Sequence, residues 1–572
     1  HIERNGGSID LENLPLDDTG TFDMLSRGDA VGVFQLESSG MRDVLKNLKP
    51  DRFEDIIAVV ALYRPGPMDN IPAFIRRKHG EEEVDCLHEL LEPILLETYG
   101  IMIYQEQVMQ SAQLLAGYSL GGADLLRRAM GKKIQSEMDA QQAIFVKGSV
   151  ENGVDGKKAA QIFKQVEKFA GYGFNKSHAA AYALVAYQTA YLKHNYPVEF
   201  MAASMTYDMN NTDKLAGFKQ ELERLRIDLL PPSINNSLPE FSVEVREDGT
   251  KAVRYALSAI KNVGGAAMLG LVNERLENGP FKSISDFTFR LDPRSINKRL
   301  LENLIRSGSL DCVNGNRRML IGNLEEILKH AAAAASEKAS GQIGLFGDVM
   351  APETQDIPLN PIDDWSSIDR LRQEFEAVGF YLTGHPLADY EASLKKLKIT
   401  TSQELMEKGI SVARVKLAGL VMNKQERTSA KGNRFAFVQL SDTSGVYEVA
   451  LFSDALSSSR EFLETGTAVL ITGDFRVDDE GGGRLTAQKV EPLEPIVAQA
   501  AMGLRIFVEK PEILPQLKSV IEQGGRGRGR VSLVLTLNED DEAEINLPET
   551  YQLNTAIRAP VKSLPGIQVQ DI

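Results

Sequence analysis

Two basic stretches decide which fold and function this sequence predicts: Leu126-Arg127-Arg128-Ala129-Met130-Gly131-Lys132-Lys133 and Gly171-Tyr172-Gly173-Phe174-Asn175-Lys176-Ser177-His178. The window that contains them, residues 124–176, holds ten Lys or Arg against six Asp or Glu. The whole chain, in contrast, has a formal net charge of -16 at pH 7. A basic region in an acidic chain predicts that this region binds a multiply charged anion.

The first stretch has the pattern of a helix that ends near Gly131. Its apolar residues are spaced as an inner face: Leu120, Leu125, Leu126 and Ala129. Arg127 and Arg128 alone would complement the helix dipole, which stabilises by about 0.3–1 kcal/mol. Lys132 and Lys133 follow closely, however, and four cations that repel one another predict an anion among them. Arginine suits phosphate because its planar fork binds two oxygens together.

The second stretch predicts the start of a helix over residues 179–196, with Asn175 or Ser177 as its cap. The free backbone N–H groups at a helix start attract anions. Lys176 adds positive charge at this point, and His178 adds charge that depends on pH.

Two aromatic residues precede this predicted helix start. Tyr172, which lies between two glycines, offers a flat face on which a base can stack. Tyr172 or Phe174 could instead form a hydrophobic staple that closes the helix start. Taken jointly, the two stretches predict a nucleotide-binding site with these members: Arg127, Arg128, Lys132, Lys133, Tyr172, Lys176 and His178.

The residues quoted so far, with further strings, resemble the alpha subunit of bacterial replicative DNA polymerase III. The matching strings are long and ordered: Val33-Phe34-Gln35-Leu36-Glu37-Ser38, Ala61-Leu62-Tyr63-Arg64-Pro65-Gly66-Pro67, Tyr104-Gln105-Glu106-Gln107-Val108-Met109, residues 126–133, residues 169–178 and Gly379-Phe380-Tyr381-Leu382-Thr383-Gly384-His385-Pro386. The resemblance covers essentially the whole chain. It implies that Arg127 and Arg128 hold the incoming deoxynucleoside triphosphate (dNTP), with Tyr172 and His178 beside its base and sugar.

The same resemblance implies a Mg²⁺ cofactor whose ligands lie elsewhere. Two-metal nucleotidyl transfer needs a pair or triad of carboxylates, and no Asp-x-Asp occurs in the 572 residues. The family's catalytic aspartates belong to a palm, which we expect upstream of His1, so no catalytic residue is assigned and this chain alone is predicted to be inactive. A first residue other than Met is typical of a segment of a longer protein. No His spacing suits a metal ligand set either.

The resemblance also implies partners. These are primer-template and single-stranded DNA, the sliding clamp, a clamp-loader subunit bound by the C-terminal domain, and a proofreading exonuclease bound by an N-terminal region that is missing from this chain.

Length and composition indicate a multidomain globular protein. A chain of 572 residues with 43% hydrophobic and 25% charged residues predicts three to five domains. No segment is apolar enough to predict a membrane span. The two cysteines, Cys86 and Cys312, are far apart, which favours a reducing cytoplasm and argues against a thiolate metal site.

We predict a multidomain α+β fold with mostly helical fingers, a tandem helix-hairpin-helix, a β-rich OB barrel and a small α/β C-terminal domain. The predicted parts are residues 1–30, a polar and turn-rich connection from a preceding palm; 31–230, the fingers; 231–330, the helix-hairpin-helix domain; 331–400, a clamp-binding segment and linker; 401–495, the OB domain; and 496–572, the C-terminal domain, with a flexible loop over residues 524–530.

Two segments predict contacts with DNA phosphates. In the first, Lys261-Asn262-Val263-Gly264-Gly265 has the pattern of a helix-hairpin-helix, whose backbone N–H groups meet phosphate without reading sequence. The two glycines could equally form only a tight connection. A second helical unit follows over residues 297–312.

The other segment is a predicted barrel with strands at residues 415–421, 434–440, 447–452, 468–475 and 485–490. Its basic loop would bind a single strand's backbone through Lys424, Arg427, Lys431 and Arg434. Phe435 and Phe437 could stack on bases, although alternating Phe residues more often lie in a core.

One short segment predicts a docking peptide. An exposed Leu-Phe pair in a loop is unusual, and Gln342, Leu345 and Phe346 match the family's clamp-binding peptide. The alternative is a turn that packs the pair onto its own domain.

The sequence therefore predicts part of a DNA-directed DNA polymerase that positions dNTP and DNA and binds the clamp. Two alternatives remain at this point. One is an error-prone polymerase of the same family, and the other is a non-catalytic DNA-binding scaffold.

Overall fold

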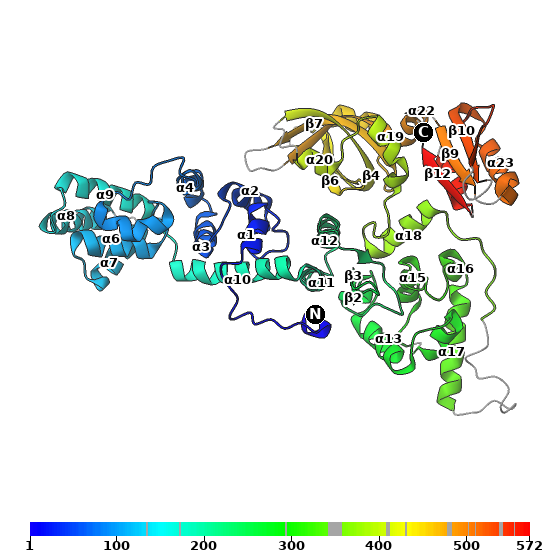
Figure 1. Ribbon diagram of the computed structural model, residues 1–572, viewed down its shortest axis with the longest axis horizontal. Helices are drawn as coiled ribbons and strands as arrows, with labels where there is room; N and C mark the ends of the chain where they lie inside the picture. Colours follow the sequence, from blue (N-terminus) through cyan, green and yellow to red (C-terminus); the bar gives the residue numbers. More distant parts are fainter. Residues whose placement is uncertain are drawn as a thin grey trace. The chain divides into compact units, whose positions relative to one another are not determined.

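The computed structural model describes residues 1–132, 135–170, 173–291, 294–340, 357–407, 412–429, 432–477, 483–500, 503–508, 511–536, 542–553, 555–564 and 566–571. The chain divides into two compact units, His1–Met201 and Ala202–Ile572. The fold is multidomain α+β, as predicted, with helical and β-rich parts (Figure 1).

The first unit is helical. Its helices are α1 (Thr19–Ser26), α2 (Ser39–Leu48), α3 (Phe53–Leu62), α4 (Ile71–Lys78), α5 (Glu92–Leu95), α6 (Gln105–Ala116), α7 (Leu120–Lys132), α8 (Gln135–Glu151), α9 (Gly156–Ala170) and α10 (Lys176–Asn195). One apolar core joins α1 to α4 with α10, and a second joins α5 to α9. Helix α11 (Pro197–Tyr207) crosses the boundary between the units.

Helix α10 lies against α3 and α1 along a face of small residues. Ala179, Ala183, Ala186 and Ala190 are fully buried on this face, together with Tyr187. Spacings of three and four residues place them on one side of the helix. The four alanines let neighbouring helices approach closely, and the Tyr187 ring contacts Phe22 of α1 and Phe53 of α3.

Residues 1–30 contain a helix that the sequence did not predict. Asp18 caps α1 by accepting a hydrogen bond from the Thr21 backbone N–H at 2.8 Å. Phe22, Met24 and Leu25 of this helix are buried in the core around α10. Burial of these three apolar side chains stabilises a helix in a segment that is otherwise polar, so residues 1–30 are more than a turn-rich connection.

The inner face of α7 differs from the prediction. Ala123, Leu126 and Ala129 are buried, whereas Leu120 is 65% exposed and Leu125 is 63% exposed. At 100° per residue, the two exposed leucines fall to either side of the stripe that faces α6, α8 and α9. The predicted helix end near Gly131 is confirmed to within one residue, because α7 ends at Lys132, but Gly131 lies inside the helix and is not the left-handed residue that follows it.

The second unit begins with helices and a small sheet. In chain order these are α12 (Thr212–Arg224), β1 (Leu229–Leu230), β2 (Ser242–Val245), β3 (Lys251–Arg254), α13 (Gly265–Asn278), α14 (Ile284–Arg290), α15 (Lys298–Arg306), α16 (Arg317–Gly322), α17 (Leu324–Ser340), α18 (Ser367–Val378), α19 (Glu391–Lys396) and α20 (Ser402–Glu407). The strands pair in the order β1-β3-β2. The predicted helical unit over 297–312 corresponds to α15, which Asn297 caps.

A closed barrel follows, with strand order β4-β5-β6-β8-β7. Its strands are β4 (Val412–Thr428), β5 (Arg434–Ser441), β6 (Val446–Leu451), β7 (Ala468–Val477) and β8 (Gly483–Pro492), and it is flanked by α21 (Ser453–Ser459) and α22 (Leu493–Ala500). The five predicted strands are confirmed. Ala436, Val438 and Leu440 point into the barrel core, as the period of two along a strand requires.

The C-terminal part is a four-stranded sheet with two helices. These elements are β9 (Gly503–Val508), α23 (Leu514–Gln523), β10 (Arg526–Thr536), β11 (Glu542–Asn546), α24 (Thr555–Ser563) and β12 (Ile567–Asp571), and the strand order is β11-β10-β9-β12. The predicted loop over residues 524–530 is wrong from Arg526 onward, because β10 starts there. The Gly527 backbone N–H donates a hydrogen bond to the Thr550 carbonyl at 3.1 Å. Because Thr550 is distant in the sequence, the glycine-rich composition of the segment gave no indication of this bond.

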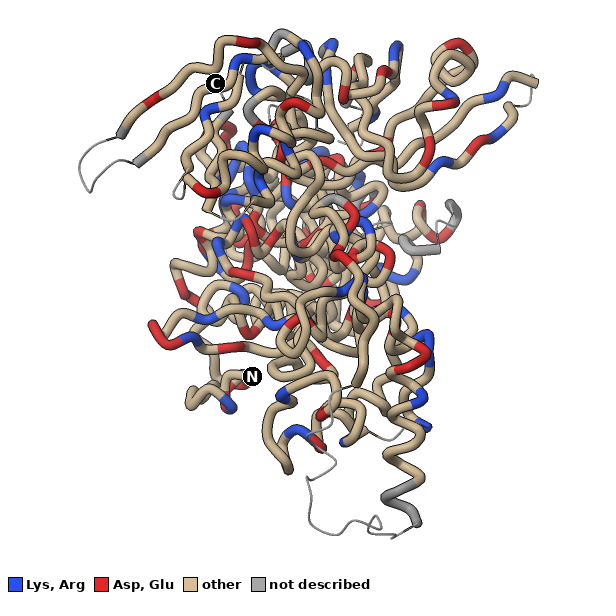
Figure 2. Tube along the Cα trace, turned by 90° about the vertical axis from the view of Figure 1, so that its right-hand side faces the viewer, with Lys and Arg blue, Asp and Glu red and all other residues tan. Residues whose placement is uncertain are grey.

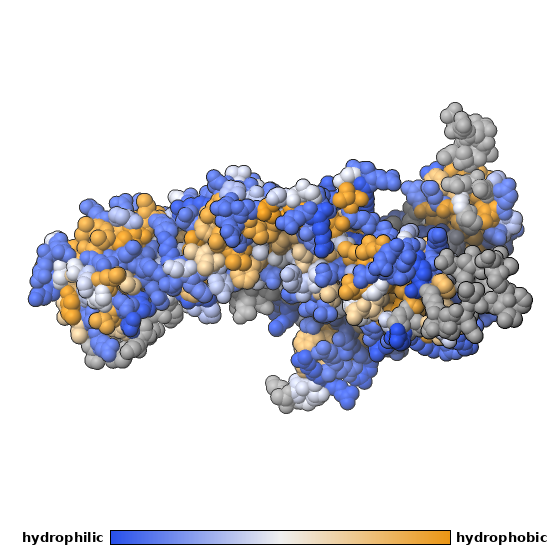
Figure 3. Space-filling view, turned by 90° about the horizontal axis from the view of Figure 1, so that it is seen from below, coloured by the Kyte–Doolittle hydropathy of each residue, from blue (hydrophilic) through white to orange (hydrophobic). Residues whose placement is uncertain are grey.

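Acidic and basic residues are interspersed along the trace (Figure 2). Apolar and polar side chains likewise alternate on the face drawn in Figure 3. No helix within the described ranges is long and apolar enough to cross a bilayer.

Candidate functional site

The start of α10 is capped by Asn175, one of the two predicted caps. Its side-chain oxygen accepts a hydrogen bond from the His178 backbone N–H at 2.8 Å. The residue before the cap, Phe174, is tied to the segment before α6: its N–H donates to Ile103 O at 3.0 Å, and its carbonyl accepts from the Gln105 N–H at 2.9 Å. Two segments that are far apart in sequence therefore meet at this helix start.

The first two residues of α6 strengthen this junction with their side chains. Gln105 Nε2 donates to Gly173 O at 3.0 Å. Glu106 accepts from the Asn175 side chain at 2.8 Å and from the Lys176 backbone N–H at 2.9 Å. One free N–H group of α10 is thus occupied by a carboxylate of the same chain.

Arg127 and Arg128 share a counter-ion on their own helix. Arg127 donates to Asp124 Oδ1 from Nε at 3.0 Å and from Nη2 at 2.8 Å, and Arg128 Nε lies 2.8 Å from Asp124 Oδ2. Hydrogen bonding from Arg127 and the charge of both guanidinium groups hold the pKa of Asp124 below its usual value. Part of the repulsion that predicted an external anion is therefore relieved within the helix.

The two arginines differ in how they are held. Arg127 also donates from Nη1 to Gln105 Oε1 at 3.2 Å, and its side chain is 27% exposed. The Arg128 side chain is 64% exposed. Arg128 is consequently the more accessible of the two to a ligand in solution.

The aromatic rings at the start of α10 are accompanied by Arg64, a cation that was not among the predicted site residues. Arg64 lies over the Phe174 ring at 4.3 Å, and burial lowers the pKa of its guanidinium. The His178 ring lies 5.3 Å from the Phe174 ring and 4.5 Å from the Tyr182 ring. Phe174 also packs against the core around α10, as the staple alternative predicted.

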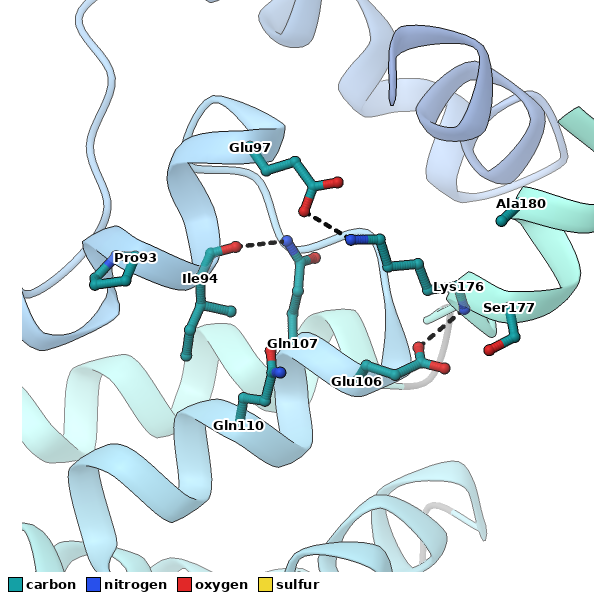
Figure 4. Close-up of a pocket in the computed structure, with 9 residues that line it drawn as sticks. All are labelled: Pro93, Ile94, Glu97, Glu106, Gln107, Gln110, Lys176, Ser177 and Ala180. Carbon is teal, nitrogen blue, oxygen red and sulfur yellow. Dashed lines mark hydrogen bonds and ion pairs between the residues drawn. The ribbon is translucent and has the colours of Figure 1, made fainter. Parts of the chain in front are cut away.

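Lys176 is held in an ion pair. Its ammonium donates to Glu97 Oε2 at 2.7 Å and lies 5.4 Å from the Tyr104 ring centre. Figure 4 shows this pair beside an open pocket of about 500 Å³. The pocket is lined by Pro93, Ile94, Glu97, Glu106, Gln107, Gln110, Lys176, Ser177 and Ala180.

Some predicted site residues lie outside the described residues: Lys133, Tyr172, Lys431, Gln342, Leu345 and Phe346. Lys132 is the last residue of α7.

The predicted phosphate-binding hairpin leads into α13. Asn262 has a left-handed backbone with φ of 63°, and Gly264 is the extended residue that precedes the helix. A side chain at Gly264 would meet nothing within 4 Å, so the backbone is open to a phosphate here. Lys261 turns elsewhere: its ammonium lies 5.8 Å from the Phe375 ring on α18, and burial lowers its pKa.

The barrel carries aromatic side chains outside its core. Phe435 and Phe437 alternate with the inward residues of β5, so the expectation that alternating Phe lies in the core is wrong here. Phe435 is 5.6 Å from Phe437 and 6.3 Å from Phe452, which is exposed. The Arg427 guanidinium lies 5.6 Å from the Phe437 ring centre. Stacking rings next to a cation can bind single-stranded nucleic acid.

Three segments match known domain families. Residues 1–153 match the bacterial DNA polymerase III alpha subunit finger domain, residues 226–320 the helix-hairpin-helix motif, and residues 415–493 the OB-fold nucleic acid binding domain. The chain is 46% identical over 571 residues to DNA polymerase III subunit alpha of Caulobacter vibrioides (strain NA1000 / CB15N), which covers 99% of this chain and 49% of that protein.

The chain belongs to the DNA polymerase III alpha-subunit family. The alpha subunit of Escherichia coli (strain K12) is 43% identical over 525 residues, which cover 90% of this chain and 45% of that protein. The chain thus spans about half the length of these alpha subunits. Its finger-domain match starts at residue 1, and α1 is one of the helices within that match.

The residues that join the two basic stretches were not predicted from the sequence. Gln105, Glu106 and Arg64 lie in strings that carried the alpha-subunit resemblance, which is the one signal that could have found them. Asp124 was counted in the charge balance without being recognised as the counter-ion of its own helix. Contacts between residues so far apart in sequence do not follow from periodicity.

Proposed function

We propose that this chain is the nucleotide-positioning and DNA-binding part of a replicative DNA-directed DNA polymerase. The observation that carries the proposal is the junction at α10. Gln105 contacts both Arg127 and Gly173, so the two basic stretches meet in one place. Membership of the alpha-subunit family supports the reaction class.

In this proposal Arg128, and Lys132 and Lys133 after it, neutralise the triphosphate of the incoming dNTP. Arg128 suits this role because it is exposed and charge-assisted hydrogen bonds are roughly twice as strong as neutral ones. Tyr172 and His178 would lie beside base and sugar. Lys176 would act only after its ion pair with Glu97 opens.

The Mg²⁺ of such an enzyme needs other ligands. Among the described residues, no group of three or more His, Cys, Asp or Glu could hold a metal ion. This part of the chain does not fit the metal, so we assign its ligands to a palm outside this sequence and derive no catalytic step here.

DNA would be held in the second unit. The backbone from Lys261 to Gly265 would meet duplex phosphates, and the barrel would bind a single strand through Lys424, Arg427, Lys431 and Arg434. Because phosphate contacts release counterions, binding should weaken steeply with salt.

The family resemblance supports further partners. We propose that Gln342, Leu345 and Phe346 bind the sliding clamp and that the C-terminal sheet meets the clamp loader. A proofreading exonuclease would bind a region outside this chain, and the complex would work in the cytoplasm.

The experiment compares Arg128→Ala with Lys147→Ala in the intact polymerase subunit on primed template. Lys147 is a matched control, because it is an exposed cation on α8 whose replacement removes the same charge. Arg128→Ala should raise KM for dNTP by about tenfold or more while the Kd for DNA changes little. Equal KM values in the two variants would return Arg128 to a helix-dipole role.

A further inference from the structure

The Gln105 side chain makes two hydrogen bonds in opposite directions. Its oxygen accepts from Arg127 Nη1 at 3.2 Å, and its nitrogen donates to the Gly173 carbonyl at 3.0 Å. These partners are 22 and 68 positions away in the sequence. One amide therefore links α7 to the segment that leads into α10.

The link also completes the restraint on Arg127. Asp124 holds Nε and Nη2, and Gln105 holds Nη1, so all three guanidinium nitrogens are engaged. A guanidinium held at every nitrogen has lost most of its rotational freedom before a ligand arrives. Its orientation is then set jointly by α6 and α7.

The position requires a side chain with both a donor and an acceptor at this length. Glu would offer only acceptors, and its charge would face the Gly173 carbonyl oxygen. Lys would offer only donors, which Arg127 cannot accept. Asn has both groups on a shorter side chain. Backbone space is also tight, because a side chain at Gly173 would come within 3.3 Å of Gln105 Cγ.

We infer that Gln105 is a positioning residue of the nucleotide site: it fixes the Arg127 guanidinium relative to Gly173 and so fixes α7, which carries Arg128, relative to the start of α10. This inference rests on the proposed function. It assigns Arg128 to the ligand and Arg127 to the scaffold that carries it.

The test uses Gln105→Met in the intact polymerase subunit, because Met keeps the length and removes both hydrogen bonds. The backbone bond between Gln105 and Phe174 remains, so the segment stays paired. Gln161→Met, at an exposed position of α9, is the matched control, because it makes the same replacement away from the candidate site. Steady-state KM for dNTP and kcat are measured for both, for Arg127→Met and for the double variant Gln105→Met/Arg127→Met.

We expect Gln105→Met to raise KM for dNTP about tenfold with kcat within about twofold, and Gln161→Met to match the parent. Because Gln105 acts through Arg127, the double variant should be no worse than Arg127→Met alone. Gln105→Glu keeps only the acceptor, so its KM for dNTP should lie between the KM values of the parent and of Gln105→Met.

Two results would overturn the inference: an unchanged KM in Gln105→Met, or effects that multiply in the double variant. Arg128→Ala separates these failures from failure of the proposed function. If Arg128→Ala raises KM and Gln105→Met does not, only the positioning role is wrong. If neither raises KM, the nucleotide site itself is wrong.

Discussion

Lys176 donates to Glu97 at 2.7 Å across 79 positions of sequence. Both side chains are partly exposed, and such pairs contribute about 0.2–1 kcal/mol. We expect Glu97→Gln to lower the free energy of unfolding by less than about 1 kcal/mol in urea denaturation. A double-mutant cycle with Lys176→Met should give a coupling energy of the same size that disappears in high salt. A coupling that persists in about 1 M salt would contradict this.

We expect His385 to make the stability of the second unit depend on pH. Its Nδ1 accepts from the Leu387 N–H at 3.1 Å, and its Nε2 lies 3.0 Å from Ser441 Oγ, which suits a neutral ring protonated at Nε2. Burial, with a smaller contribution from the charge of Lys219, lowers the pKa of His385 to about 4.

Because the unfolded chain binds the His385 proton more tightly, its contribution to stability is complete above about pH 6.5 and is lost as pH falls toward 4. We expect a loss of about 2 kcal/mol between about pH 7.5 and 5 in urea denaturation, and a flatter profile in His385→Gln. The control is His79→Gln, at an exposed position of the first unit, which should keep the pH profile of the parent. If the stability of the parent and of His385→Gln changes with pH in parallel, His385 is not the source of the pH dependence.

The outer aromatic side chains of the barrel should bind single-stranded DNA. Phe435→Ala or Phe437→Ala should each weaken binding by about 1–3 kcal/mol, because each removes a stacking face. Ile545→Ala, at an exposed position of the C-terminal sheet, should change nothing. Fluorescence anisotropy measures the affinity of each variant for single-stranded DNA across a salt titration. The loss of affinity caused by removing a stacking ring should persist at salt concentrations that weaken phosphate contacts. Equal affinities for all three variants would leave the aromatic side chains without a role in binding.

The clamp contact is tested by replacing Leu345 and Phe346 together with Ala. Each apolar side chain that enters a pocket stabilises by roughly 1.5–3 kcal/mol, so the double variant should lose clamp binding in a pull-down with purified clamp. Processive synthesis by the intact subunit should fall while distributive synthesis continues.

The control for the clamp experiment is a second double variant, Leu11→Ala/Leu16→Ala. It removes two exposed apolar side chains from the first unit and should bind the clamp as the parent does. If the Leu345 and Phe346 variant also binds as the parent does, the contact lies elsewhere, and the C-terminal domain is the next segment to test.

The chain by itself should bind DNA without extending a primer. Its described residues include no group of three or more His, Cys, Asp or Glu that could hold a metal ion, while the hairpin before α13 and the barrel are both present. Primer extension with Mg²⁺ and all four dNTPs measures the first property, and a gel shift on primed template measures the second. Extension above background would contradict the assignment of the metal ligands to a palm.

Local sequence patterns predicted most helices and strands. Features that depend on contacts between residues distant in sequence were not predicted. Alternation along β5 located the strand, because a period of two is written in consecutive residues. It did not tell which side Phe435 faces, since both sides of a barrel strand can carry apolar residues. Gly527 and Gly529, in the first residues of β10, suggested a loop, because pairing with a distant segment leaves no mark in composition.

The site shows the same limit. Asn175 was among the predicted caps because capping depends on residues three positions apart. Gln105 was not assigned, because its two partners become neighbours only after α6, α7 and α10 have packed. Asp124 could have been assigned from its spacing of three and four residues to the arginines, which places all three on one helix face.

Helix α10 is a rigid connection between the candidate site and the end of the first unit. It has 20 residues, which corresponds to about 30 Å of helix, and its buried alanines pack along α3 and α1. Because packing along its length resists bending, the Asn175 end and the Asn195 end keep a fixed separation. The residues of α6 that bond to the start of α10 are therefore held at a fixed distance from the segment that approaches Met201, the last residue of the first unit.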